Sequence, residues 1–263
     1  MKFLTINVHG WQEENALEKL KQLANAIHET RYDAVALQEV SQHRESDIAY
    51  QNIRTDNYGL LLNQALKELG SSDYELFWDV SHYSFDVYEE GLSLLVRHPN
   101  VRTESFYITD STSLDHWKSR KILGGTWEIN DQLISLYTCH LGWWDDVEED
   151  YQVKVDRLLD RVEQNNQPLL LLGDFNVPDH VKNEGYDYLL SKGLYDTHQL
   201  AHEQIGEYTI IGDIAGWDGN QQGLKIDYIF ANWQADVSKS RIVFNGIDGP
   251  IISDHFGVEV FLN

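Results

Sequence analysis

The order of the apolar segments along the chain is the feature that most restricts its fold. Short runs rich in Val, Ile, Leu and Phe, as strands require, alternate with longer stretches whose apolar residues recur every three or four positions, as in helices. The strand-like runs gather in two halves of the chain, and each half also carries helical stretches. This order predicts two β-sheets packed face to face, with helices on the outside.

The expected elements can be placed by residue number. We expect helices at 13–30, 58–69, 147–162 and 185–191. We expect strands at 2–8, 33–39, 74–80, 92–97, 101–108, 121–129, 133–140, 168–172, 226–231, 241–244 and 257–261. Because no Pro- or Ser-rich linker, low-complexity segment or short repeat separates them, residues 1–263 are expected to form one domain.

Charge limits the partners that the chain can bind. Lys and Arg number 20 and Asp and Glu number 43, so the formal net charge is −23. Such a charge repels the phosphate backbone of DNA or RNA, which proteins normally hold with many Lys and Arg side chains. The one dense basic cluster, Lys118, Arg120 and Lys121, suffices for a single phosphate. Nucleic acid is therefore not the expected partner.

The cysteine content and the first residues indicate the compartment. Cys139 is the single cysteine, which excludes an internal disulfide framework and a Cys-rich zinc site. The opening residues, MKFLTINVHGWQEEN, become polar too early for the apolar core of a signal peptide. No segment approaches the roughly 20 apolar residues that cross a membrane. We expect a cytoplasmic protein that does not bind membranes.

Polar residues stand at the ends of several expected strands, where active sites on sheet scaffolds usually lie. Asn7 ends the first strand, Glu39 ends the second, and His140 ends the run Leu136-Tyr-Thr-Cys-His. Each has a structural alternative, because a buried amide or imidazole can simply pair with backbone. A carboxylate that closes a buried strand must be paired, face solvent or bind a metal.

The sharpest signal is Gly173-Asp-Phe-Asn176, which directly follows the buried apolar run Leu169–Leu172. Glycine lets backbone or ligand approach closely. Asp174 could then orient or deprotonate a water, and Asn176 could donate a hydrogen bond to an anion. The alternative is a turn in which both side chains only cap the backbone.

Two further positions near the C-terminus carry ionisable groups. Asp227 lies inside the apolar run Ile226–Phe230, where an acid is costly unless a cation or a salt bridge holds it. Ser253-Asp-His255 precedes the last strand, and Asp227 beside His255 would make an oriented imidazole. Walker-type loops and Gly-x-Ser-x-Gly elbows are absent from the sequence, so nucleophilic serine or cysteine catalysis has no motif behind it.

Taken together, these segments resemble the endonuclease/exonuclease/phosphatase superfamily, which has the DNase I-like fold. The matching segments occur in the family's order over nearly the whole chain, at 5–7, 37–39, 138–141, 173–176, 226–229 and 253–255. Gly-Asp-Phe-Asn after an apolar strand, combined with a terminal Ser-Asp-His, is fairly specific. The resemblance implies an α/β fold, a four-layer α/β/β/α sandwich of two packed mixed β-sheets with outer helices, and a metal-dependent phosphoric ester hydrolase.

The resemblance implies a metal site. Glu39, with Asn7 nearby and Asp254 placed to assist, is similar to the family's Mg²⁺ site, and Mn²⁺ is the alternative ion. Mg²⁺ prefers oxygen ligands and neutralises charge on phosphoryl oxygens. His9 departs from the pattern, since some DNA-repair members carry an acid there.

The resemblance also implies catalytic roles. Asp174 is similar to the residue that aligns or activates the attacking water, and Asn176 and His140 resemble the ligands of the phosphoryl oxygens. His255, oriented by Asp227, resembles the family's essential histidine.

Basic and aromatic residues near these motifs are candidates for binding substrate. Arg120 stands where relatives often carry an arginine before a strand, and Lys118 is close by. Tryptophans in expected loops surround the motifs, whereas core packing is the usual role of tryptophan. Flat indole rings with a polar edge suit sugars and also bases. Of the loop tryptophans Trp11, Trp117, Trp143, Trp144 and Trp217, we assign substrate contacts to Trp117, Trp143 and Trp144.

The leading interpretation is a cytoplasmic Mg²⁺-dependent phosphatase acting on a small phosphorylated carbohydrate, such as a disaccharide 6-phosphate. Among bacterial family members, the maltose 6′-phosphate phosphatases are similar in being single-domain and Trp-rich after the Thr-x-His-Leu motif. The alternatives are a metal-dependent phosphodiesterase or endonuclease, a sphingomyelinase-like hydrolase on the same fold, and a binding module without activity. Fold alone does not choose among them.

Overall fold

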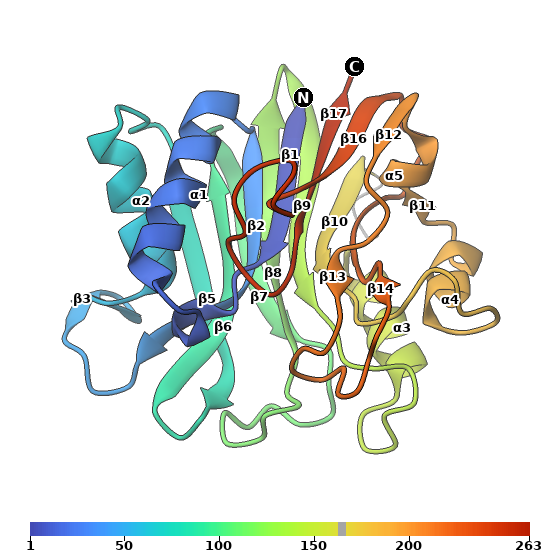
Figure 1. Ribbon diagram of the computed structural model, residues 1–263, viewed down its shortest axis with the longest axis horizontal. Helices are drawn as coiled ribbons and strands as arrows, with labels where there is room; N and C mark the ends of the chain where they lie inside the picture. Colours follow the sequence, from blue (N-terminus) through green and yellow to red (C-terminus); the bar gives the residue numbers. More distant parts are fainter. Residues whose placement is uncertain (163–166) are drawn as a thin grey trace.

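A computed structural model describes residues 1–162 and 167–263 and places two β-sheets face to face (Figure 1). One sheet runs in the order β12 (Glu203–Ile205), β16 (Val237–Val243), β17 (Gly257–Leu262), β1 (Lys2–Asn7), β2 (Ala34–His43), β6 (Tyr88–Val96), β5 (Glu75–Ser84). The other runs in the order β11 (Tyr195–Asp196), β15 (Asp227–Ala231), β10 (Leu169–Asp174), β9 (Gln132–His140), β8 (Lys121–Ile129), β7 (Asn100–Tyr107). Both sheets are mixed, because β1 pairs parallel with β2 and β9 parallel with β10.

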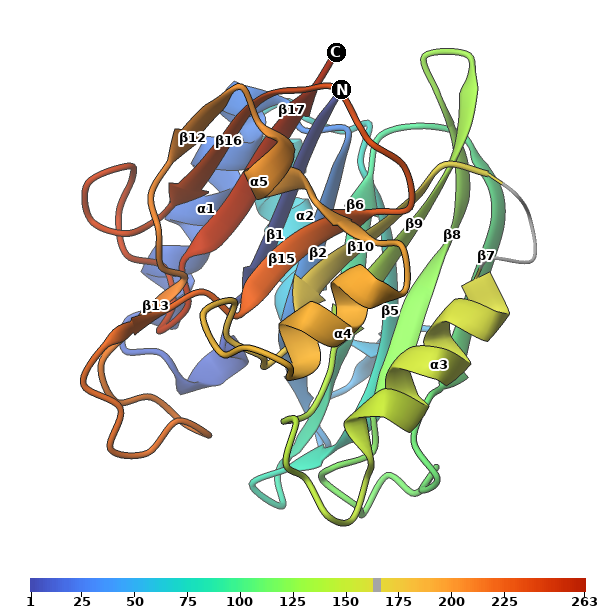
Figure 2. The same cartoon turned by 90° about the vertical axis from the view of Figure 1, so that its right-hand side faces the viewer.

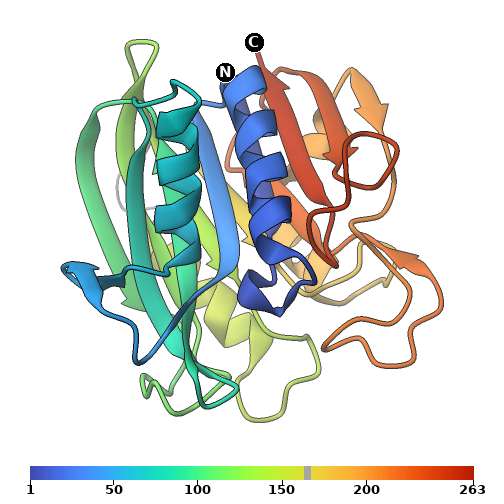
Figure 3. The ribbon, with the colours of Figure 1, turned by 60° about the vertical axis from the view of Figure 1, so that its left-hand side comes forward.

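Helices cover the outer faces of both sheets. Figure 3 shows α1 (Ala16–Thr30) and α2 (Tyr58–Glu68) side by side over the first sheet. Figure 2 shows α3 (Tyr151–Val162) and α4 (Gly185–Ser191) over the second. The predicted four-layer α/β/β/α sandwich is therefore confirmed. The short elements are η1 (Gly10–Gln12), α5 (Thr197–Leu200) and the strand pairs β3 (Ile48–Tyr50) with β4 (Ile53–Arg54) and β13 (Ile210–Ile211) with β14 (Gly223–Leu224).

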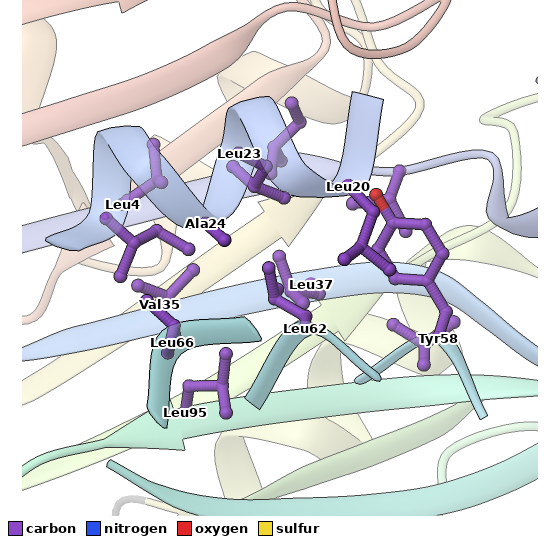
Figure 4. Packing of buried hydrophobic residues seen from close by; sticks show 14 of the residues in the cluster. Leu4, Leu20, Leu23, Ala24, Val35, Leu37, Tyr58, Leu62, Leu66 and Leu95 are labelled. Atoms are coloured by element: carbon purple, nitrogen blue, oxygen red, sulfur yellow. The ribbon is translucent and has the colours of Figure 1, made fainter. Parts of the chain in front are cut away.

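Alternation along the strands divides the core into layers. On β1, Leu4 lies beneath α1 in the cluster that also holds residues of α2 (Figure 4), whereas Phe3 faces the second sheet. On β10, Leu170 and Leu172 face the first sheet, whereas Leu171 packs toward α3 and α4. A strand that is covered on both faces needs apolar residues at every position. This requirement explains the uninterrupted leucine run before the Gly-Asp-Phe-Asn motif.

Two helix starts differ from the prediction. The helix predicted from residue 147 begins at Tyr151, because the Asp150 side chain accepts a hydrogen bond from the backbone N–H of Val153 at 3.0 Å and caps the first turn. Val147, the first residue of the predicted helix, is 96% exposed in the preceding loop. The first helix begins at Ala16, since Asn15 adopts a left-handed conformation that interrupts it. Among the described residues, no helix is long and apolar enough to span a membrane.

Candidate active site

Strand register sets the floor of the candidate site. β10 runs parallel to β9 and antiparallel to β15, so Asp174 lies beside His140 on one strand and Asp227 on the other. Side chains alternate between the two faces of a strand. Asp174 therefore shares the face of Leu170 and Leu172, which pack between the sheets. The side chains of His140, Asp174 and Asp227 therefore meet at one end of the inter-sheet core. Together with Asn7, Glu39 and His255, they form the floor of the candidate site.

Asn7, the last residue of β1, connects the two sheets at this end. Its Nδ2 donates to Glu39 Oε1 at 2.8 Å and to Asp174 Oδ2 at 3.2 Å. Its Oδ1 accepts the backbone N–H of His9 at 3.1 Å. The amide thus holds two carboxylates in place, and its oxygen is paired with backbone. The sequence predicts Asn7 as part of a metal site, and in the structure its amide is a hydrogen-bond donor to two of the acids, Glu39 and Asp174.

Glu39 reaches this cluster through a β-bulge. The pairing of β2 with β6 shifts register between Leu37 and Val40, and Glu39 has a φ of 53°, which few non-glycine residues adopt. Leu37 and Val40 both pack toward the helices. Without the extra residue, Glu39 would share the face of Leu37 and point away from Asn7. Strained backbone of this kind concentrates at functional sites.

The Gly-Asp-Phe-Asn motif owes its glycine to close strand packing. A Cβ at Gly173 would lie 1.9 Å from the carbonyl oxygen of Cys139, so a larger residue would push β10 away from β9. Beyond Asp174, Asn176 turns the chain with a φ of 52° and donates from Nδ2 to the Leu141 carbonyl at 2.9 Å. The backbone N–H of Asn176 donates to Asp174 Oδ1 at 2.9 Å. The motif therefore shapes the turn that holds Asp174.

His255 and Asp227 form an oriented pair, as the sequence predicted. Nδ1 of His255 lies 2.9 Å from Asp227 Oδ2, and Nε2 lies 3.8 Å from Asp174 Oδ2. Burial alone would lower the pKa of His255, but the carboxylates of Asp227 and Asp174 outweigh burial and raise it to about 10. The two carboxylates therefore favour the imidazolium form of His255, whose Nε2 faces Asp174.

The carboxylates of Asp174 and Glu39 are not neutralised by a Lys or Arg side chain of the described residues. Burial raises the pKa of Asp174, and Asp227 raises it further. Burial likewise raises the pKa of Glu39, with a contribution from Glu90. Within residues 1–162 and 167–263, no Lys or Arg forms an ion pair with either carboxylate. A group of buried acids in this state favours a cation.

His140 lies between these acids, in surroundings that favour its neutral form. Its Nε2 is 3.6 Å from Asp174 Oδ2 and 3.9 Å from Glu39 Oε1. Burial lowers the pKa of His140 well below its usual value, and the nearby Arg120, His82 and His255 lower it further. The surroundings thus favour the cationic form of His255 and the neutral form of His140.

Asp254 lies next to the floor, on the side of His9. Its Oδ2 is 3.6 Å from His9 Nδ1, and its backbone N–H donates to Glu13 Oε1 at 3.2 Å. His9 Nδ1 is also 2.9 Å from Glu13 Oε1. Burial would lower the pKa of His9, but Glu13, Asp254 and Glu39 together raise it to about 9. The acids around His9, the histidine that departs from the family pattern, therefore favour its protonated form.

The floor opens into a cleft of about 600 Å³. Loops form its rim, and in Figure 1 they lie at the end of the sheets opposite the two chain termini. The rim combines aromatic and acidic side chains, namely Tyr83, Phe85, Asp86, Asp115, Trp117, Trp143 and Asp218. Arg120 is the one Lys or Arg in the described lining.

Three of the predicted substrate-binding residues lie at this cleft. Trp117 is 53% exposed, and its ring lies 6.1 Å from that of Trp143. Arg120 is buried beneath them, where its Nη1 donates to the Trp117 carbonyl at 2.8 Å. The guanidinium is therefore held in a fixed position between the rim and the acidic floor.

The other two predicted substrate-binding residues, Trp144 and Lys118, lie outside the lining of the cleft. Trp144 packs against Tyr151 and Tyr188 at ring-centroid distances of 5.7 and 6.0 Å and lines a neighbouring hollow. The Nζ of Lys118 lies 3.0 Å from Asp146 Oδ1 and 3.3 Å from Glu148 Oε1. Lys118 is outside the cleft lining.

Some residues of the cleft escaped the sequence reasoning. His82 on β5 and Glu90 on β6 are paired in register, with 3.3 Å between Nε2 and Oε1. The predicted strands stop at Val80 and start at Leu92, because the hairpin between them is polar. Extending the second strand would have placed Glu90 on the face of Leu94 and Val96, between the sheets. Alternation would have turned His82 toward the helices with Trp78 and Val80, and only the register shift between Val80 and His82 brings it to the cleft.

The comparison with protein families gives one match that spans almost the whole chain. The model of the "Endonuclease/Exonuclease/phosphatase family" matches residues 4–255. No curated protein matches the sequence.

Solved structures agree in fold. A protein titled an endonuclease/exonuclease/phosphatase family protein, from Leptotrichia buccalis C-1013-b, is 36% identical, with a TM-score of 0.94 over 100% of this chain and 99% of that chain. A mannosyl-6-phosphatase from Bacteroides thetaiotaomicron VPI-5482 is 18% identical, with a TM-score of 0.69 over 100% and 99%. A humanized D. rerio TDP2 is 15% identical, with a TM-score of 0.66 over 100% and 98%. The last two likenesses establish the fold alone.

Proposed function

Because the chain belongs to the endonuclease/exonuclease/phosphatase family, whose members are divalent-metal-dependent hydrolases, we propose that it is a phosphatase that hydrolyses a small phosphorylated carbohydrate. The observation that carries this proposal is the composition of the cleft rim. Phe85, Trp117 and Trp143 offer apolar ring faces, and Asp86 and Asp115 offer acceptors for hydroxyl groups. Such a mixture suits a sugar.

The same rim argues against a polyanion. Double-stranded DNA carries one charge about every 1.7 Å along its axis, and a protein that binds it normally lines its path with Lys and Arg. Here Arg120 faces the cleft, while Lys121 forms an ion pair with Asp79 at 2.7 Å. A single guanidinium suits one phosphate group. The net charge of −23 adds to this argument.

The acids of the floor fit a divalent cation such as Mg²⁺ or Mn²⁺. Glu39 supplies oxygen ligands without a Lys or Arg partner in the described chain, and Asp174 and Glu90 add negative charge close by. We assign Glu39 as the principal ligand, with Asn7 ordering it and Asp254 beside it. When bound, the ion would neutralise charge on the phosphoryl oxygens.

Side chains of the protein accept the proton of the attacking water and stabilise the charge on the phosphoryl group. Asp174, whose pKa is raised by burial, is suited to accept a proton from the attacking water at Oδ2. The Nε2–H of cationic His255 stabilises negative charge on the phosphoryl group, and Asp227 fixes the ring that carries it. Asn176 and neutral His140 donate hydrogen bonds to other phosphoryl oxygens.

A second hollow supports a substrate larger than one sugar ring. It has a volume of about 640 Å³ and shares Trp143, Asn176, Gly216 and Asp218 with the cleft. Trp144 and Trp217 add further indole surface. A disaccharide 6-phosphate could place its phosphorylated ring in the cleft and its second ring here, close to Asn176.

The test is phosphate release from a substrate panel with and without Mg²⁺. The panel contains monosaccharide and disaccharide phosphates, nucleotides, plasmid DNA and sphingomyelin, and Asp174→Asn is the matched inactive control. We expect the highest kcat/KM with a sugar phosphate. Efficient cleavage of plasmid DNA, without phosphate release from any sugar phosphate, would instead identify a nuclease, and rapid sphingomyelin hydrolysis a phosphodiesterase.

A further inference from the structure

Asn176 is held from two sides by groups that leave its amide one orientation. Its Oδ1 accepts a hydrogen bond from Trp217 Nε1 at 3.1 Å, and its Nδ2 donates to the Leu141 carbonyl at 2.9 Å. An indole N–H can only donate, and a carbonyl can only accept. A flipped amide would therefore lose both hydrogen bonds at once.

One N–H of the Asn176 amide remains free of these contacts. An asparagine amide carries two N–H donors, and the Leu141 carbonyl occupies one of them. Asn176 is 4% exposed and lines the cleft. We propose that Trp217 is a positioning residue that fixes the Asn176 amide, so that its second N–H meets an oxygen of the reacting phosphoryl group. This inference rests on the role of Asn176 in the proposed function.

The orientation matters because the two ends of the amide have opposite effects on an anion. An N–H directed at a phosphoryl oxygen stabilises the charge that grows there, whereas a carbonyl oxygen in the same place would repel it. Preorganised donors avoid the cost of reorientation during the reaction. Without the indole N–H, a single hydrogen bond to Leu141 would have to hold the amide.

The loop that carries Trp217 is built to keep the indole in place. Ile214 and Trp217 pack against the small cluster of Ile210, Leu224 and Ile226. The backbone N–H of Trp217 donates to the Ile214 carbonyl at 3.0 Å. An apolar ring alone would serve this packing. The hydrogen bond to Asn176 is what specifically requires tryptophan.

Gly216 brings this loop against the rim of the cleft. It has a φ of +83°, and a Cβ there would lie 2.4 Å from Cζ2 of Trp143. The glycine therefore allows the loop to lie flat on the Trp143 ring, with Trp217 directly next in sequence. The position of the indole is thereby tied to the cleft itself.

The test is Trp217→Phe, which keeps an aromatic ring for packing and removes the N–H. The matched control is Trp11→Phe, which removes an indole N–H that donates to the Asp56 carbonyl, also at 3.1 Å, away from the cleft. With p-nitrophenyl phosphate and with the best substrate of the panel, we expect kcat of Trp217→Phe to fall about three- to tenfold, as for loss of one neutral hydrogen bond. KM should change less than twofold, and Trp11→Phe should leave kcat unchanged.

A double-mutant cycle with Asn176→Ala identifies how Trp217 acts. If Trp217 works through Asn176, Trp217→Phe should have no further effect on kcat in the Asn176→Ala background. Equal, additive losses in both backgrounds would overturn the inference, and so would wild-type kcat in Trp217→Phe. If Asn176→Ala itself keeps wild-type kcat, Asn176 does not stabilise the phosphoryl group. That result would contradict the proposed function, and the inference on Trp217 would fall with it. Thermal unfolding of each variant separates these outcomes from misfolding.

Discussion

The floor and the rim of the cleft are built in different ways. Four floor residues, Asn7, His140, Asp174 and Asp227, stand at the ends of paired strands, and register sets their relative positions. Glu39, predicted to end its strand, instead lies at a bulge inside β2, which continues to His43, and His255 lies just before β17. Rim residues stand on hairpins and loops, among them Phe85, which is 68% exposed, and Trp117. The strands hold the floor by many hydrogen bonds, whereas loop contacts hold the rim.

This difference separates chemistry from selectivity. A floor fixed by backbone pairing can hold reacting groups in place for any phosphate ester, whereas loops can change without disturbing the sheets. We therefore expect floor variants to lower kcat on every substrate. Rim variants should alter KM only for substrates large enough to touch the rim.

Removal of the divalent ion should give the largest effect, since it exposes the whole acidic floor to the substrate. Exhaustive treatment with EDTA should abolish hydrolysis of both a sugar phosphate and p-nitrophenyl phosphate, and Mg²⁺ or Mn²⁺ should restore it. Loss on only one substrate would place the ion at the rim instead. Full activity after chelation would exclude the proposed role of Glu39.

Replacement of single floor residues should rank next. His255→Ala and Asp174→Asn should each lower kcat by about 10²–10⁴-fold on both substrates, as expected for groups that transfer protons or stabilise charge in the transition state. Asp227→Asn should be milder, because it disturbs His255 without removing the ring. Steady-state kinetics measures all three, and wild-type turnover in His255→Ala would contradict the assigned floor.

The floor could be predicted from sequence because alternation and register are regular. The leucine run, the apolar strand around Asp227 and the Thr-x-His ending of another strand all place a polar side chain at the same end of the sandwich. The bulge that turns Glu39 inward could not be predicted from the sequence, because it is visible only in the pairing of β2 with β6.

The rim could not be predicted in the same way, because loops lack a repeating pattern. The sequence marked Trp143 and Trp144 equally, yet Trp143 lines the cleft and Trp144 packs on Tyr151 and Tyr188. It also marked Trp217 only as a tryptophan in a Gly-rich loop. Its hydrogen bond to Asn176 joins residues 41 positions apart and depends on tertiary packing alone.

Rim tryptophans provide a direct test of selectivity. Trp143→Ala should raise KM for a sugar phosphate several-fold, because it removes a ring face beside the reacting end, while hydrolysis of p-nitrophenyl phosphate should change little. Trp144→Ala should raise KM for a disaccharide phosphate more than for a monosaccharide phosphate, since it lines only the neighbouring hollow. Equal loss of kcat on all substrates would mean that these rings support the floor.

Lys118→Ala should give the smallest effect, although the sequence places this lysine beside Arg120. Its ammonium group is engaged by Asp146 and Glu148, and Asp146 Oδ1 also accepts the backbone N–H of Glu148 at 2.9 Å. A partly exposed pair of this kind contributes up to about 1 kcal/mol to the free energy of unfolding. We therefore expect a slightly lower melting temperature and a KM within twofold of wild type, measured with a sugar phosphate and with p-nitrophenyl phosphate. A tenfold rise in KM on both would show that Lys118 swings into the cleft, giving the rim a second cation and weakening the argument that it accepts only one phosphate.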